Sequence, residues 1–121
     1  MPITNILVVD DSPTDRAYLS ELLSKNGFKV STAESAEDCM AKVKQLRPDL
    51  VLMDVIMPGQ NGFQATRALS KDESTKDIPV IICTSKGQET DKVWGMRQGA
   101  KDYVVKPVNP AELLGKIKAL G

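Results

Sequence analysis

Three aspartates directly follow apolar runs of the sequence. Asp54 follows the uninterrupted run from Leu50 to Met53, and Asp10 and Asp11 follow the run "NILVV". A charge at the edge of an apolar core costs free energy unless a partner compensates it. Carboxylates in contact also repel one another and raise each other's pKa unless a cation neutralises the cluster. The pattern therefore predicts a cation beside these acids.

A hard divalent metal ion is the cation that such a cluster favours. The chain contains no histidine and no clustered cysteines, so the candidate ligands are oxygen atoms. Mg²⁺ suits oxygen ligands on an open rim, where it keeps several waters, and it prefers phosphate partners. Lys106, after the run "DYVV", supplies a second positive charge, and Thr84, after "PVIIC", offers a hydroxyl to an oxyanion. Asp54 could then act as a metal ligand, as a general base, or as a nucleophile toward phosphorus that forms a labile aspartyl phosphate.

These residues can meet only if the fold brings the ends of several strands together. Five short apolar or β-branched runs predict strands at residues 5–9, 29–33, 50–53, 79–83 and 102–105. Segments of helical period separate the runs, so we expect an α/β fold with a doubly wound (βα)5 parallel sheet between two helical layers. The second and fifth runs carry polar residues typical of edges, which favours the flavodoxin-like strand order 2-1-3-4-5. Ligands bind beyond the carboxyl ends of strands in such sheets, so the acids, Thr84 and Lys106 would share one rim.

Several helix boundaries are marked by local signals. Ser12 and Asn109 each precede a proline, which predicts two N-caps with proline at the first helical position. The pair Asn26–Gly27 predicts the end of the first helix.

The helical segment before the last strand contains the single tryptophan of the chain. Val93, Met96 and Ala100 form the stripe that we expect to face the sheet. Trp94 then lies near the flank of the helix, either as a lid on the core or as an exposed anchor for a partner, and we expect it to be exposed.

Composition limits the classes of function. The 121 residues suggest a single domain over residues 1–121, with no room for an output domain. Sixteen basic residues balance sixteen acidic ones, unlike a nucleic-acid binder, and no apolar run reaches the roughly 18 residues of a membrane span. Cys39 and Cys83 lie in apolar patterns, so we expect buried, reduced thiols and a cytoplasmic location. The lack of histidine excludes histidine metal sites and Ser-His or Cys-His catalysis.

Four segments are similar to a known family. "ILVVDDS", "PDLVLMDVIMPGQNG", "PVIICTS" and "GAKDYVVKPV" resemble, in order and spacing, the signature segments of the bacterial two-component response-regulator receiver domain. The resemblance extends over essentially the whole chain. The stretches "NGFQATRALSKD" and "KGQETDKVWGMRQGAKDYVVKPV" further resemble stand-alone twitching-motility receivers of the PilH kind, which act in a chemosensory pathway for type IV pili.

The resemblance implies a signalling receiver and not an enzyme. Asp54 would accept a phosphoryl group from a phosphohistidine on a partner sensor histidine kinase and lose it slowly by autodephosphorylation. Mg²⁺ would be held by Asp10, Asp11, Asp54 and the backbone carbonyl of Ile56. Output would come from a downstream protein on the face formed by the strand at residues 102–105 and the helical segments before and after it, or the domain would serve as a phosphate sink.

Further residues take roles from the same resemblance. Thr84 and Lys106 would contact the phosphoryl group, and Tyr103 would rotate inward as a switch. The Lys106–Pro107 peptide would be cis. Ser85 departs from the family, which more often has alanine there, and this change bears on dephosphorylation and partner access.

The acids are also compatible with simpler roles and with two different functions. Asp10 and Asp11 could favour the start of the following helix, and Asp54 could belong to a turn at Pro58–Gly59. A flavodoxin-like cofactor binder would share the fold, but the acids of "DDSPTD" would repel a flavin phosphate. An aspartate-nucleophile phosphohydrolase commonly has a second acid two residues after the nucleophile, where this chain has Ile56.

Overall fold

A five-stranded parallel sheet forms the centre of the molecule. The computed structural model describes residues 2–57, 59 and 61–121, so Pro58 of the turn considered above lies outside the described residues. Within these residues the strands are β1 Asn5–Val9, β2 Lys29–Ala33, β3 Leu50–Met53, β4 Val80–Thr84 and β5 Asp102–Val105. They pair in the order β2-β1-β3-β4-β5, which confirms the predicted topology.

The fourth strand lies one residue later than the predicted range 79–83. Pro79 has no N–H to donate to a neighbouring strand, although its carbonyl accepts a hydrogen bond from Val51 N at 3.0 Å. At the other end, Thr84 still pairs with Val105, and its carbonyl accepts a bond from Lys106 N at 2.8 Å. The ladder therefore extends to Thr84 and carries this hydroxyl on a strand.

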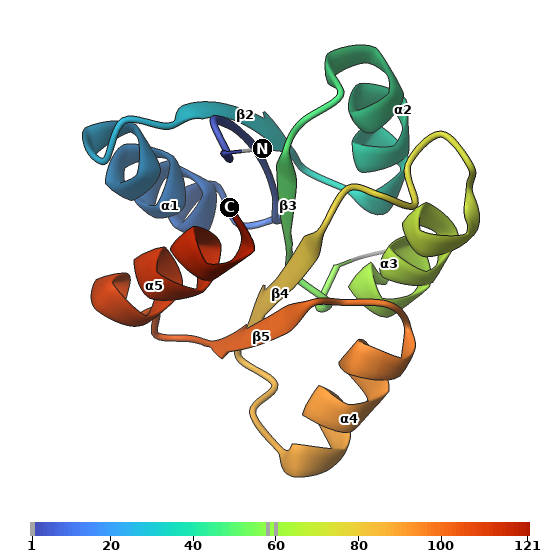
Figure 1. Ribbon diagram of the computed structural model, residues 1–121. Coiled ribbons are helices and arrows are strands. Elements are labelled where there is room, and N and C mark those ends of the chain that lie inside the picture. Colours follow the sequence, from blue (N-terminus) through green and yellow to red (C-terminus); the bar gives the residue numbers. More distant parts are fainter. Residues whose placement is uncertain (1, 58, 60) are drawn as a thin grey trace.

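Helices cover both faces of the sheet. Their bounds are α1 Pro13–Lys25, α2 Ala36–Leu46, α3 Gly62–Lys71, α4 Glu89–Arg97 and α5 Pro110–Leu120. Figure 1 shows α1 and α5 on one face and α2, α3 and α4 on the other. None of the helices in the described part of the chain has both the length and the apolar character that crossing a membrane requires.

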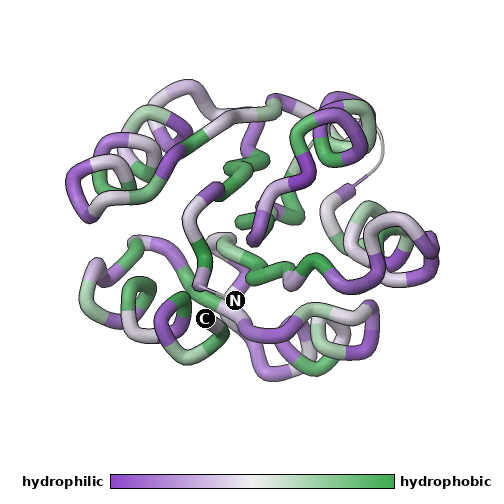
Figure 2. Tube along the Cα trace, turned by 45° about the horizontal axis from the view of Figure 1, so that its top comes forward, coloured by the Kyte–Doolittle hydropathy of each residue, from purple (hydrophilic) through white to green (hydrophobic). Residues whose placement is uncertain are grey.

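Two buried clusters lie on opposite faces of the sheet. Ile6 and Val8 point into the cluster with residues of α1 and α5, whereas Leu7 and Val9 point into the cluster with residues of α2 and α3. Both faces of β1 are thus buried, which explains why its apolar residues form a continuous run. Figure 2 shows hydrophobic strands at the centre and mixed, largely hydrophilic helices around them.

The two thiols are buried on different faces. Cys39 of α2 belongs to one cluster and Cys83 of β4 to the other, and both are free. The prediction of buried, reduced thiols is confirmed, because the sheet separates the two side chains.

The predicted helix boundaries also form. The side chains of Ser12 and Asn109 accept hydrogen bonds from the backbone N–H three residues later, and proline occupies the first turn of α1 and of α5. Asn26 caps the end of α1, and Gly27 follows with φ of 89°, which residues other than glycine rarely adopt.

The predicted inner stripe of α4 was wrong for two of its three residues. Ala100 is buried, but the exposed fractions of Val93 and Met96 are 45% and 46%. Gly95 faces the sheet instead, at a distance where an added Cβ would lie 2.7 Å from Cδ1 of Ile82. The helix packs too closely on β4 and β5 for larger side chains on that face. Trp94 is 52% exposed, as predicted.

Candidate functional site

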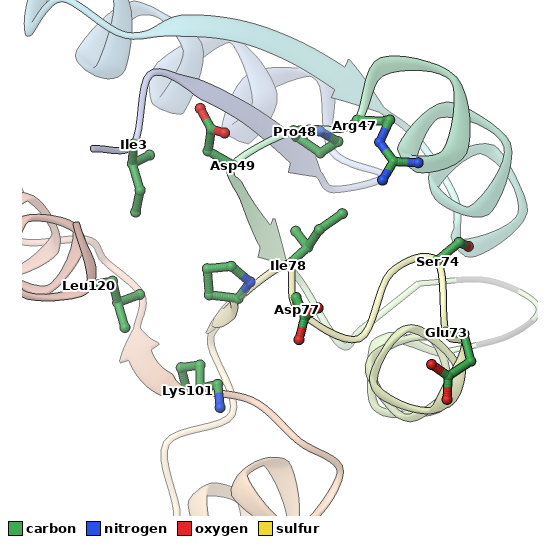
Figure 3. A pocket seen from close by; sticks show the side chains of 11 residues that line it. Ile3, Arg47, Pro48, Asp49, Glu73, Ser74, Asp77, Ile78, Lys101 and Leu120 are labelled. Carbon is green, nitrogen blue, oxygen red and sulfur yellow. The ribbon is translucent and has the colours of Figure 1, made fainter. Parts of the chain in front are cut away.

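The two ends of the sheet border different surfaces. A hollow of about 500 Å³ lies among segments that precede the strands. Figure 3 shows that both acidic and basic residues line it, such as Arg47, Asp49 and Lys101. Within the described part of the chain, this lining includes none of the residues predicted for the site. Those residues lie at the carboxyl ends of the strands, as expected for an open α/β sheet.

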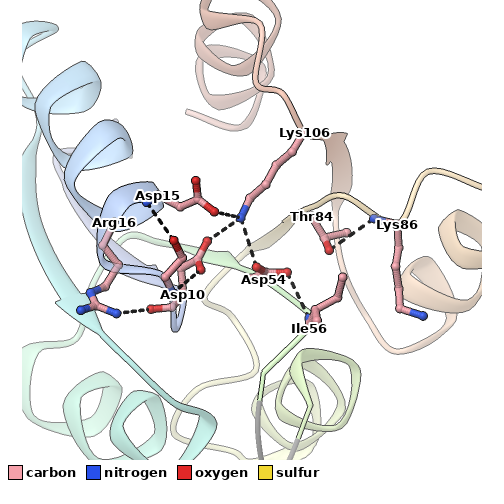
Figure 4. Close-up of polar contacts among 9 residues, drawn as sticks. Asp10, Asp15, Arg16, Asp54, Ile56, Thr84, Lys86 and Lys106 are labelled. Carbon is pink, nitrogen blue, oxygen red and sulfur yellow. Dashed lines mark hydrogen bonds and ion pairs between the residues drawn. The ribbon is translucent and has the colours of Figure 1, made fainter.

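Backbone hydrogen bonds hold the key residues in place just beyond the strands. Asp10 N donates to the carbonyl of Ala33 at 3.0 Å, and Asp54 N donates to the carbonyl of Val9 at 2.9 Å. The sheet ladder thus continues into both aspartates. Their side chains leave the sheet from positions fixed by these bonds and point toward each other (Figure 4).

The ammonium group of Lys106 joins three acidic side chains. Among the described residues, its Nζ donates to Oδ2 of Asp10 at 2.7 Å, of Asp15 at 2.8 Å and of Asp54 at 3.1 Å (Figure 4). Backbone N–H groups bind the other carboxylate oxygens of the two buried acids: Ser12 N donates to Asp10 and Ile56 N to Asp54. Lys106 therefore fixes the relative positions of two buried acids that would otherwise repel.

Three aspartates offer a set of ligands for a hard cation. One carboxylate oxygen of each of Asp10, Asp11 and Asp54 lies within 4.8 Å of the others. Asp10 and Asp54 are buried, whereas Asp11 is exposed, so a bound ion would keep water ligands on that side. Three carboxylates beside one ammonium leave an excess of negative charge. This oxygen-only donor set fits Mg²⁺.

Burial has opposite consequences for the acid and the base. It raises the pKa of Asp10, and hydrogen bonds from Lys106 and Ser12 offset only part of that effect, while the charge of Asp54 adds to it. Burial also opposes the charge of Lys106, but the hydrogen bonds to Asp10 and Asp15 and the attraction of Asp54 outweigh it and raise its pKa. Several acids share one ammonium group. Lys106 therefore stays charged, whereas the negative charge of Asp10 is only partly offset by its hydrogen-bond partners.

Thr84 and Tyr103 approach the loop that follows β4. Thr84 is fully buried, and its Oγ1 accepts a long contact of 3.5 Å from Lys86 N. Among the described residues, the hydroxyl hydrogen of Thr84 has no acceptor. Tyr103 is 6% exposed, and its hydroxyl donates to the carbonyl of Lys86 at 2.7 Å. Burial, with the charges of Asp91 and Asp54, raises the pKa of Tyr103 to about 12. The ring of Tyr103 is thus turned inward. Ser85, between Thr84 and Lys86, is exposed.

The peptide bond between Lys106 and Pro107 is cis, as the resemblance implied. Ile56 contributes its N–H to Asp54, and its side chain is 47% exposed at the edge of the rim.

Sequence reasoning missed Asp15 as a partner of Lys106. An acid in the first turn of a helix, as Asp15 is in α1, ordinarily indicates only a favourable interaction with the helix N-terminus. Side chains of a helix lean toward its N-terminus, and α1 begins directly beside the rim. That direction is the signal that could have identified Asp15. The residue also lines a hollow of about 400 Å³ with Tyr18, Lys106 and Pro107.

Comparisons with known proteins agree with this geometry. A family model described as response regulator receiver domain matches residues 6–118. Protein PilH of Pseudomonas aeruginosa is 56% identical over 118 residues, which cover 98% of each chain. The phosphate regulon transcriptional regulatory protein PhoB of the same organism is 39% identical over 95% of this chain, which spans 50% of that protein.

Solved structures support the same assignment. The chemotaxis protein CheY4 of Vibrio cholerae superimposes with a TM-score of 0.91 at 31% identity, covering 98% of this chain and 99% of that one. The match favours neither a flavin-binding protein nor a phosphohydrolase. The chain belongs to the response regulator receiver domain family and is a signalling receiver homologous to PilH and to CheY-like regulators.

Proposed function

We propose that Asp54 is the phosphoryl acceptor of this receiver and that a phosphohistidine of a sensor histidine kinase is the donor. The observation that carries the proposal is the shared ammonium of Lys106, which holds the two buried carboxylates of Asp10 and Asp54 at one rim. An oxygen of Asp54 would attack phosphorus, and the phosphorus–nitrogen bond of the donor would break. The imidazole would leave with the bonding electron pair and take up a proton.

The surrounding residues would bind the phosphoryl oxygens. Lys106 would turn one of its N–H groups toward them, and the Thr84 hydroxyl would donate its free hydrogen to another. Asp10, Asp11, Asp54 and the carbonyl of Ile56 would hold Mg²⁺, which would supply positive charge opposite the phosphoryl oxygens. Tyr103, already inward, would act as a switch that reports the state of Thr84 through the loop at Lys86.

The product would be an acyl phosphate, which is labile in water. We expect autophosphorylation from small phosphate donors and slow autodephosphorylation, as the resemblance to receiver domains implies. Ser85 lies exposed beside Thr84, and its hydroxyl would bear on the rate of hydrolysis and on partner access.

The similarity to PilH supports a role in twitching-motility chemosensory control, and the receiver would work in the cytoplasm. Output would come through contact with another protein, or the domain would drain phosphoryl groups from a shared kinase. The exposed Val93, Trp94 and Met96 on α4 support contact through the face of α4, β5 and α5. We expect neither nucleic acid nor a membrane as a partner.

Incubation with acetyl phosphate and Mg²⁺, followed by intact mass measurement, tests the acceptor. The wild type should gain one phosphoryl group, and Asp54→Asn should gain none. Asp49→Asn is the matched control, because Asp49 lies at the opposite end of β3 and binds Thr4 and Asn5. This variant should label as the wild type does. Labelling of Asp54→Asn at the wild-type rate would refute the assignment.

A further inference from the structure

Asp15 is a fourth acid that belongs to neither the metal-ligand cluster nor the acceptor. It comes from the first turn of α1, and its Oδ2 accepts a hydrogen bond from Lys106 Nζ at 2.8 Å. Its side chain is 43% exposed, compared with 2% for Asp10 and 8% for Asp54. Figure 4 shows Asp15 on the side of Lys106 away from Asp54.

The hydrogen-bonding capacity of Lys106 makes its partners competitors. A lysine ammonium has three N–H donors and no acceptor. In the described structure, three carboxylates accept from these donors. A phosphoryl oxygen could therefore bind Lys106 only if one carboxylate gave up its bond.

Asp15 is the partner that gives way most easily. Released from Lys106, its exposed carboxylate would be rehydrated by water, whereas the buried carboxylates of Asp10 and Asp54 have little access to solvent and would then depend on Mg²⁺ alone for compensation. The negative charge of Asp15 also adds to the repulsion that an incoming anionic phosphoryl group meets at this rim. Both the bond of Asp15 to Lys106 and its negative charge therefore disfavour binding of a phosphoryl group.

We propose that Asp15 is a positioning residue that holds Lys106 away from the phosphoryl oxygens and so slows phosphorylation of the receiver. The inference rests on the proposed function of Asp54. It predicts that removing the Asp15 charge speeds phosphoryl transfer from a small donor and strengthens binding of a phosphoryl analogue. Since the ion pair is open to solvent on the Asp15 side, its contribution is modest, and the expected change is roughly two- to fivefold.

The chain offers a matched control at another helix start. Asp15 and Glu112 are both the third residue of a helix that begins with proline, and the N–H of each donates to the side chain of the N-cap residue. Glu112 is exposed, and its side chain makes no hydrogen bond or ion pair within the described part of the chain. Glu112→Gln therefore removes the same charge from the same helical position without touching Lys106.

The experiment compares Asp15→Asn, Asp15→Glu and Glu112→Gln with the wild type. Rates of mass gain from acetyl phosphate are measured at saturating Mg²⁺, and beryllium fluoride affinity is measured by calorimetry. Asp15→Asn should be roughly two to five times faster and tighter. Asp15→Glu, which keeps a carboxylate within reach of Lys106, and Glu112→Gln should behave as the wild type does.

A second measurement does not depend on phosphorylation. Acylation of Lys106 by acetic anhydride is followed at the peptide level without Mg²⁺. It should be faster in Asp15→Asn than in Glu112→Gln, because the amine of Lys106 is no longer held by the carboxylate of Asp15. Equal behaviour of these two variants in all measurements, or slower phosphorylation of Asp15→Asn, would overturn the inference while leaving Asp54 as acceptor. A wild type that accepts no phosphoryl group would overturn the proposed function as well.

Discussion

Two aspartates at opposite ends of the sheet have opposite pKa shifts. Hydrogen bonds from the backbone of Asn5 and Thr4 lower the pKa of Asp49. Asp10 is more deeply buried, and burial raises its pKa. Lys106 offsets only part of this effect, because Asp10 shares it with two other acids. The rim therefore carries an acid whose charged form is destabilised by burial. A bound cation would reverse that cost.

This difference predicts how magnesium stabilisation depends on pH. Because the folded pKa of Asp10 lies above its ordinary value of 3.8, its contribution to stability is full below that value. That contribution is lost as the pH rises through the raised pKa. Lys106, whose pKa is also raised, stays protonated throughout this range and contributes a constant amount. Mg²⁺ binds ionised carboxylates, so it should stabilise the fold more as Asp10 ionises.

Thermal melts with and without Mg²⁺ check this prediction. The increase in Tm should be at least about twice as large near pH 7.5 as near pH 4.5. Asp10→Asn should show little increase at either pH. An equal Mg²⁺ effect at both pH values in the wild type would show that ionisation of Asp10 is not coupled to the metal.

At the scale of elements, the start of α3 is fitted against the acceptor segment. A Cβ on Gly62 would overlap the carbonyl oxygen of Asp54 and lie 2.7 Å from Cα of Val55. These atoms are backbone and cannot move without displacing Asp54. Gly62→Ala should therefore lower the free energy of unfolding by more than about 2 kcal/mol, through overpacking. It should also slow labelling of Asp54.

Gly115 provides the contrasting case in a helix. Among the described atoms, nothing lies within 4 Å of a Cβ added there in α5. Gly115→Ala should raise the free energy of unfolding by about 0.5–1 kcal/mol, because alanine favours helix more than glycine does. Urea denaturation measures both variants. A mild effect at Gly62 would mean that the loop before α3 adapts without disturbing the acceptor.

Local signals explain which elements could be predicted from the sequence. The N-caps at Ser12 and Asn109 and the end of α1 depend on a few neighbouring residues, and all three formed. The acids and Lys106 could be placed on one rim because strand ends in a parallel sheet share an edge. The inner face of α4 could not be predicted from the sequence of the helix. It depends on how closely Gly95 packs on Ile82 and Tyr103, which belong to the strands β4 and β5. The contact of Asp15 with Lys106 likewise joins residues 91 positions apart.

The whole molecule is a sheet enclosed between two helical layers, and each layer buries one cysteine. Cys39 is 0% exposed and Cys83 is 1% exposed. Burial raises the pKa of each thiol to about 12, with minor effects from nearby charges. Thiolate is the reactive form, so neither side chain should react in the native state. Reaction must then wait for opening of the fold.

Thiol labelling by a disulfide reagent at neutral pH measures whether the two layers open together. If unfolding is cooperative, Cys39 and Cys83 should be modified at the same slow rate, and Mg²⁺ with beryllium fluoride should slow both by the same factor. An exposed thiol introduced by Ser74→Cys should react at once and serves as the control. Faster labelling of Cys39 alone would show that α2 opens locally while β4 stays covered, so that the two layers are separate units of stability.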